Sequence, residues 1–216
     1  ACVGAKSSPE RRRGPPMRGA VMAKFFGNLH LVLLVGLVLA IAVAFGVGPN
    51  GDQVQAVFRW LHVLSGILWI GLLYYFNFVQ IPTMPKIPDD QKPAVSKFIA
   101  PEALWYFRWA AMATIATGLI LAYLSDYLWS AITLGAAESF ANPMTTLIGI
   151  GMWLGSIMWF NVWFVIWPNQ KKALGIVTVE ADVKAKAART AMLFSRTNTV
   201  LSVPMLLCMV GQGHFG

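Results

Sequence analysis

The residue with the most distinctive chemistry in this sequence is a histidine inside an apolar segment. His62 follows Arg59 by three positions, so both side chains fall on one face of a helix, one turn apart. An intramembrane histidine is costly without a partner, and it is a functional-site hypothesis by default. Imidazole nitrogen suits haem iron, and an arginine suits a propionate. We therefore expect either a haem b with His62 as its metal ligand and Arg59 at a propionate, or an interhelical hydrogen bond from His62 without a cofactor.

The second axial ligand of such a haem stays open. His214 lies just past the last apolar segment, in the same half of the protein as His62. His30 belongs to the opposite half, separated by most of the roughly 30 Å of hydrocarbon, so one haem cannot bridge it to His62. Met152, Met205 and Met209 also map near His62, although methionine commonly fills gaps in packing. We include His214 with His62 and Arg59 as predicted cofactor-binding residues.

A second polar grouping maps to the other half of the apolar segments. Two arginines occur there with amides and hydroxyls and few acidic residues, which predicts a substrate or anion site formed by Arg108, Asn161, Arg196 and Asn198. Alternatively, each arginine extends to the membrane interface while the amides join helices. The sequence contains no serine–histidine–aspartate set, phosphate-binding loop or zinc-protease motif. The catalytic residues are therefore unknown.

Five apolar runs must position these side chains. Of the 216 residues, 57% are hydrophobic and only 12% are charged, about half the charge of an ordinary soluble domain. Each run approaches the roughly 20 residues that cross hydrocarbon. We predict an all-α polytopic membrane bundle over residues 25–216 with helices at 29–47, 56–81, 103–124, 145–167 and 191–210, after a flexible basic leader at 1–24. The first run also resembles a secretory signal that ends near Ala42-Val43-Ala44, so an anchor and a cleaved signal both stay open.

Basic residues alternate between the connections. They cluster in the leader, between the second and third runs, and between the fourth and fifth runs, whereas the other connections offer only Arg59. The positive-inside rule then predicts a cytoplasmic amino end and an external carboxyl end. Because the basic residues lie between apolar runs, the net charge of +8 indicates topology, and we expect a lipid bilayer as the partner and no nucleic acid.

Four blocks of sequence carry a family resemblance: FRWLHVLSGILWIGLLYYFNFVQ, LWYFRWAAMATIATG, MWFNVWFVIWPNQKK and ARTAMLFSRTNTVLSVPML. Together they resemble the amino-terminal membrane domain of the bacterial cytochrome-linked urate oxidases (urate hydroxylases), over roughly 70% of the chain. The resemblance implies a multi-pass protein of the inner membrane that oxidises urate and passes electrons to a cytochrome c domain. This chain has no c-type haem attachment motif and looks like a short form without that domain.

The resulting functional hypothesis is a urate-oxidase-like membrane oxidoreductase. It would bind haem b and act in electron transfer or urate oxidation with a separate redox partner, such as a cytochrome c or another membrane subunit. Two alternatives from other classes are a non-catalytic subunit or assembly module of a larger membrane complex, and a small anion transporter. Five helices without an internal repeat favour the transporter least.

Overall fold

The computed structural model describes residues 17–46 and 52–211, with side chains from residue 21 onward, and in these ranges it is helical without strands. The chain divides into two units, residues 1–53 and 54–216, which we describe separately. The first unit contains α1 (Met17–Phe26) and α2 (Leu29–Gly46). The structure differs from the predicted leader here, because α1 occupies part of it. Its sequence, MRGAVMAKFF, contains many good helix formers.

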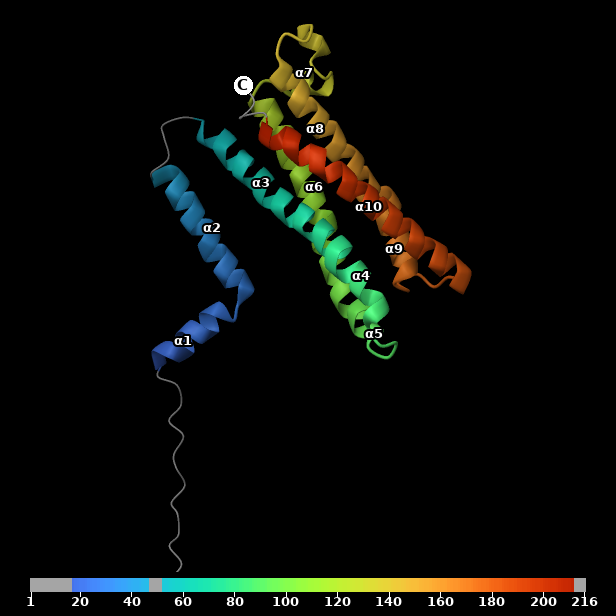
Figure 1. Cartoon of the computed structure of the whole chain (residues 1–216). Helices are drawn as coiled ribbons and strands as arrows, with labels where there is room; N and C mark the ends of the chain where they lie inside the picture. Colours follow the sequence, from blue (N-terminus) through green and yellow to red (C-terminus); the bar gives the residue numbers. More distant parts are fainter. Residues whose placement is uncertain (1–16, 47–51, 212–216) are drawn as a thin grey trace, which may run out of the picture. The chain divides into compact units, whose positions relative to one another are not determined.

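The second unit is built from four long helices, three of which are assembled from shorter segments, and from a connection that contains α7 and η4. The first long helix comprises α3 (Gln53–Tyr74), η1 (Tyr75–Gln80), α4 (Ile81–Thr83) and η2 (Met84–Lys86), and the second comprises α5 (Lys92–Ala94), η3 (Val95–Ile99) and α6 (Ala100–Leu124). The connection that follows contains α7 (Leu128–Ile132) and η4 (Ala136–Glu138). The third long helix comprises α8 (Pro143–Phe160), η5 (Asn161–Ile166) and α9 (Trp167–Ala173), and the fourth is α10 (Ala181–Gly211). In Figure 1, α4, α5 and α9 lie at one end of this unit and α7 at the other.

Five helices of the described ranges are long and apolar enough to cross a membrane: residues 29–46, 53–86, 92–124, 143–173 and 181–211. Each corresponds to one predicted apolar run, so the predicted number and order agree with the structure, while residue 47 of the first run lies outside the described residues. The helices of the second unit are longer than the predicted ones, two of which end directly before a proline. At 82 and 168 the chain instead remains helical through the proline.

Three turns of π-helix explain how these prolines are accommodated. In each, the residue directly before a proline donates its backbone N–H to the carbonyl five positions back: Ile81 to Phe76, Ala100 to Val95, and Trp167 to Val162. A proline lacks the N–H, and its ring would collide with the carbonyl four positions back in a regular α-helix. The wider turn moves that carbonyl aside. It also places Asn77 and Asn161 within π segments, which frequently mark functional sites.

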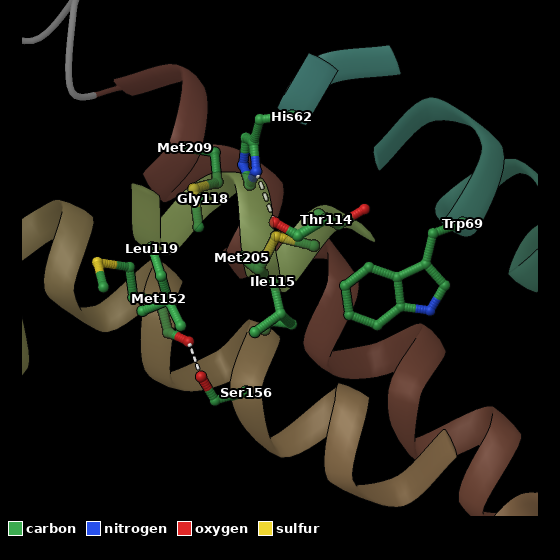
Figure 2. Close-up of a pocket in the computed structure, with 11 residues that line it drawn as sticks. His62, Trp69, Thr114, Ile115, Gly118, Leu119, Met152, Ser156, Met205 and Met209 are labelled. Carbon is green, nitrogen blue, oxygen red and sulfur yellow. Dashed lines mark hydrogen bonds between the residues drawn. The ribbon is translucent and has the colours of Figure 1, made fainter. Parts of the chain in front are cut away.

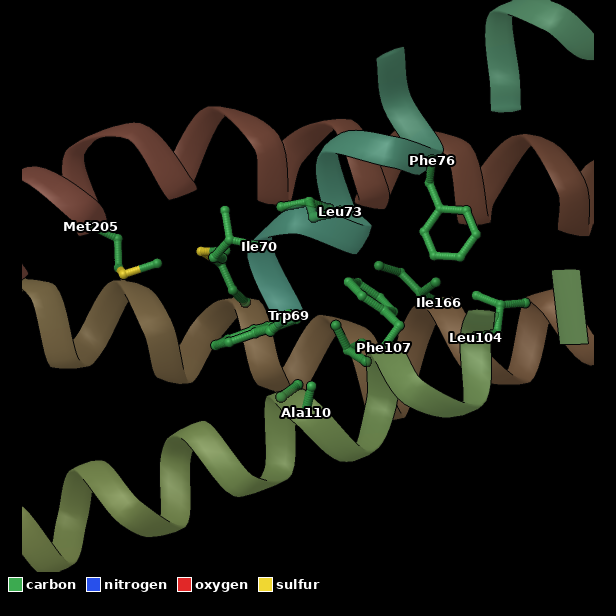
Figure 3. Close-up of a cluster of buried hydrophobic side chains, with 12 residues drawn as sticks. Trp69, Ile70, Leu73, Phe76, Leu104, Phe107, Ala110, Ile166 and Met205 are labelled. Atoms are coloured by element: carbon green, nitrogen blue, oxygen red, sulfur yellow. The ribbon is translucent and has the colours of Figure 1, made fainter. Parts of the chain in front are cut away.

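The hydrophobic core of the second unit lies between α3, α6, α8, η5 and α10 (Figure 3). Trp69, Leu73, Phe107, Met158 and Val162 are almost completely enclosed. Phe76 meets Phe107 edge to face at 5.6 Å between ring centroids. This core joins the four long helices in the region between His62 and the π segments.

The outward surface is strongly apolar. In the first unit, none of the residues of α2 is buried, although its sequence has a mean hydropathy of 2.7. In the second unit, Ile67, Phe78, Phe98, Phe164 and Val200 are all more than half exposed. A soluble monomer rarely exposes contiguous apolar area of this kind, which marks a surface that contacts a membrane or another protein.

Candidate functional site

His62 points from α3 toward α6 and binds its backbone (Figure 2). Its Nδ1 lies 2.9 Å from the carbonyl oxygen of Thr114. A carbonyl can only accept, so Nδ1 carries the proton and donates it. In the neutral ring the proton is then absent from Nε2, which keeps its lone pair. Among the described residues no group bonds to Nε2. A histidine that binds a metal usually donates its other ring nitrogen in this way.

A glycine on α6 leaves the space that the imidazole occupies. A Cβ at position 118 would lie 2.8 Å from Cε1 and 3.0 Å from Nδ1 of His62. Such distances are too short for ordinary van der Waals contact, so a side chain there would displace the ring. Gly118 lies one turn after Thr114 on the same helix, and the two residues together receive the histidine. Gly118 is therefore a positioning residue for His62.

A cavity of about 620 Å³ opens beside His62, and a smaller recess of about 50 Å³ adjoins the same side chain. The larger volume falls within the range of roughly 300–1,000 Å³ that is usual for small-molecule and cofactor sites. Its lining is mostly apolar, and it includes the thioethers of Met152, Met205 and Met209. The interhelical hydrogen bond of His62 is therefore present, as the alternative without a cofactor predicted. The cavity beside the ring also leaves the space that a haem would require.

Arg59 and Tyr127 also line the cavity, and Tyr127 directly precedes α7. Burial raises the pKa of the Tyr127 phenol above its ordinary value, and the positive charge of Arg59 opposes that shift. Nearby, Gln55 Nε2 donates to Ser125 Oγ at 2.7 Å and joins α3 to the end of α6. Arg59 is exposed, so its guanidinium can reach an anion at the cavity mouth. The predicted pairing of Arg59 with His62 on one face of a helix agrees with this placement.

The two predicted asparagines meet each other in the interior. Asn161 Nδ2 donates to Asn198 Oδ1 at 2.8 Å, and Asn198 Nδ2 donates to the Met158 carbonyl at 3.0 Å. Asn198 is completely buried. A similar contact joins η1 to α10, where Asn77 Nδ2 donates to Ser195 Oγ at 2.8 Å. These bonds match the alternative in which amides join helices.

The two predicted arginines do not lie together. Arg108 is only 8% exposed and stacks on Trp167, with Cζ 3.4 Å from the ring centroid. Arg196 is exposed on α10, next to the buried Ser195, because adjacent positions on a helix point about 100° apart. The predicted set of four therefore separates into a buried asparagine pair, a stacked Arg108 and an outward Arg196. His214 lies outside the described residues.

The structure places four residues beside His62 or Arg108 that the sequence-based prediction did not include: Thr114, Gly118, Tyr127 and Trp167. Thr114 contributes a backbone carbonyl, which any residue carries, so no residue type could reveal it. Gly118 has no side chain, and its role depends on which helix lies opposite. Trp167 is of a residue type that is common at membrane interfaces. Only its contact with Arg108 indicates a further role.

A family model described as urate oxidase N-terminal matches residues 129–216. The matched region contains Asn161, Trp167, Arg196 and Asn198, whereas Arg59, His62 and Arg108 precede it. No curated protein and no solved structure matches the chain. The match supports the resemblance that we found in the sequence motifs.

Proposed function

From this similarity over residues 129–216, we propose that the chain is a membrane protein of the urate oxidase N-terminal family that binds haem b at His62 and takes part in electron transfer. The observation that carries the proposal is the unshared Nε2 of His62 beside a cavity of about 620 Å³. Within the proposal, the hydrogen bond to Thr114 orients the ligand. Haem would supply one-electron redox chemistry, which no side chain of the site offers by itself.

Placement in a bilayer is supported by the helices and their surfaces. Five of them are long and apolar enough to cross the hydrocarbon, and their outer faces are apolar. Lys86 and Lys92 lie at the end of the second unit that also carries Lys171 and Lys172, whereas Asp126 and Glu138 lie around α7. We propose the bacterial inner membrane, with the lysine-rich end in the cytoplasm and the α7 end outside.

The residues around the cavity suit the proposed haem. His62 would supply one nitrogen ligand, and the thioethers of Met205 and Met209, which line the same cavity, would be candidates for a second ligand, because methionine accompanies histidine as a haem ligand in cytochromes. Gly118 leaves the space that the imidazole of His62 occupies beside the cavity. Arg59 at the mouth offers a positive charge to a propionate. The apolar walls would exclude water from the iron.

Urate oxidation with a separate redox partner rests on the family and on the cavity together. The family description names urate oxidase, and the cavity beside His62 would hold a group that supplies one-electron redox chemistry. A cytochrome c or another membrane subunit would receive the electrons from urate. Asn161 and Asn198 would stabilise the bundle in this proposal, since their amides already bond to each other.

The test is the visible spectrum of the purified protein in mild detergent, oxidised and then reduced with dithionite. We expect a Soret band that is lost in His62→Ala and is restored by imidazole in His62→Gly. His30→Ala is the matched control, because His30 lies in the first unit, outside the residues that line the cavity, and it should keep the spectrum. A colourless wild-type protein that copurifies with other membrane subunits would contradict the haem proposal and favour the role of a non-catalytic subunit.

A further inference from the structure

A second site lies at Trp167, in the lysine-rich half of the second unit. Two cations approach this one indole: Arg108 Cζ lies 3.4 Å from the ring centroid and Lys171 Nζ lies 5.6 Å from it. An aromatic face attracts a cation but does not neutralise it. Two positive charges beside one ring therefore repel each other unless an anion lies between or beside them.

The described part of the chain supplies no such anion. Its ion pairs join Lys92 to Asp89 and Lys186 to Asp182, and neither includes Arg108 or Lys171. Arg108 is more than nine-tenths buried, and its Nη1 is enclosed without an acceptor among the described residues. An enclosed Nη1 without an acceptor is costly, because its N–H groups lose water and gain no hydrogen bond in return. Burial of this kind is expected where a ligand provides the missing oxygens.

The site can be reached from outside the bundle. Trp167 and Lys171 are half-buried, and they lie on α9, which also carries Lys172. Arg108 occupies the same half of α6 as the lysine-rich end. A planar fork and a nearby ammonium together suit a phosphate group, which presents several oxygens to both. Phosphates of anionic lipids also gather where lysines meet the membrane interface.

We propose that Arg108, Trp167 and Lys171 form a binding site for a phosphate group. Arg108 supplies the oriented donors, Trp167 holds the guanidinium in place, and Lys171 closes the site from the surface. The phosphate is either that of an anionic lipid headgroup or a free phosphate ion. The site involves neither His62 nor its cavity, so its test is independent of haem.

The experiment uses the full chain, purified in a mild uncharged detergent. The unfolding temperature is measured with increasing short-chain phosphatidylglycerol, with the zwitterionic phosphatidylcholine, and with inorganic phosphate against chloride at equal ionic strength. We expect phosphatidylglycerol or phosphate to raise the unfolding temperature of the wild type in a saturable manner. The apparent affinity should fall about tenfold in Lys171→Gln, which removes one charged contact.

Arg196→Gln is the matched control, because it removes the same charge from an exposed position on α10. It should bind as the wild type does. Arg108→Lys should fold and bind more weakly, since it keeps the charge and loses the fork. Saturable stabilisation by phosphatidylglycerol alone assigns the phosphate to a lipid, and stabilisation by inorganic phosphate assigns it to a free ion. Equal responses of wild type, Lys171→Gln and Arg196→Gln, or no response to either ligand, would overturn the proposal. A colourless but phosphate-responsive protein would disprove the haem proposal alone.

Discussion

At the scale of single residues, the position of the His62 imidazole depends on the absence of a side chain at Gly118. The ring reaches the Thr114 carbonyl only because position 118 has no side chain. The neighbouring glycines of α3 are different: a Cβ at Gly66 would have an ordinary contact of 3.9 Å with Thr114 Cγ2, and at Gly71 it would meet nothing within 4 Å. This contrast separates a glycine that positions the ligand from glycines that only border the cavity.

We therefore expect Gly118→Ala to displace His62. The cost of overpacking, typically about 1–3 kcal/mol, should exceed the helix-forming gain of about 1 kcal/mol and lower the unfolding temperature. Haem affinity should fall about tenfold or more, as for other groups that orient a metal ligand. Gly66→Ala and Gly71→Ala are the controls and should keep both properties. Equal behaviour of all three variants in thermal unfolding and haem titration would contradict this role of Gly118.

The Tyr127 phenol gives a second residue-scale prediction. Because burial raises its pKa, the folded protein keeps this proton at a pH where the unfolded chain, with a pKa of about 10, has lost it. The contribution of Tyr127 to stability is therefore complete below about pH 10 and declines as the pH rises above that value. Removing the charge in Arg59→Gln should raise the pKa of Tyr127 further, which ultraviolet titration of phenolate can measure. Tyr127→Phe identifies the signal of this phenol, and an unchanged or lowered pKa in Arg59→Gln would contradict the coupling.

At the scale of elements, the contact between α8 and α10 depends on one of two glycines that lie about one turn apart on α8. Small residues at this spacing, here Gly151 and Gly155, commonly permit the close approach of another helix. A Cβ at 151 would lie 2.9 Å from Cys208 Cβ and 3.2 Å from Met209 Cε, whereas a Cβ at 155 would meet nothing within 4 Å. Only Gly151 therefore allows the close packing. The buried pair of Asn161 and Asn198 then adds a polar contact between η5 and the same α10.

Substitution by alanine should have different effects on stability at positions 151 and 155. Gly151→Ala should push α8 from α10, because the Cys208 Cβ belongs to the helix and cannot rotate away, and it should destabilise the protein by about 1–3 kcal/mol. Gly155→Ala should be neutral or stabilise by up to about 1 kcal/mol through helix propensity. Thermal unfolding in one detergent measures both. A Gly151→Ala protein that is as stable as Gly155→Ala would show that the helices separate without cost.

At the scale of the whole molecule, two features combine: apolar outer faces on long helices, and a lysine-rich end opposite the end that carries α7. The loop that joins η2 to α5 belongs to the lysine-rich end, and the segment between η4 and α8 belongs to the other (Figure 1). Gln91 and Ala141 are exposed representatives of the two connections. Cysteine substitutions at these two exposed positions would report the orientation of the protein without disturbing its core.

We expect Ala141→Cys to react with a membrane-impermeant maleimide in intact cells, and Gln91→Cys to react only after the membrane is opened. Both variants would carry Cys2→Ser, while the buried Cys208 gives little background. The physical reason is the cost of moving the lysine-rich end across the bilayer during insertion. The reverse labelling pattern would invert the proposed orientation, and equal labelling of both positions in intact cells would contradict placement across a membrane.

The sequence by itself determined the class and number of the long helices, because apolar length and composition are properties of one segment. It also indicated Arg59 and His62 on one face and amides that join helices. Where prolines suggested helix ends, the structure continues through π turns, since a widened turn relieves the collision that the proline ring causes.

Only the tertiary structure decided which nitrogen of His62 remains free, because that depends on a carbonyl 52 positions away. It likewise paired Asn161 with Asn198 across 37 positions, separated Arg196 from Arg108, and brought Lys171 to the same indole as Arg108. The physical reason is common to these cases. A side chain's chemistry depends on its nearest partners, and partners from different helices become neighbours only through packing.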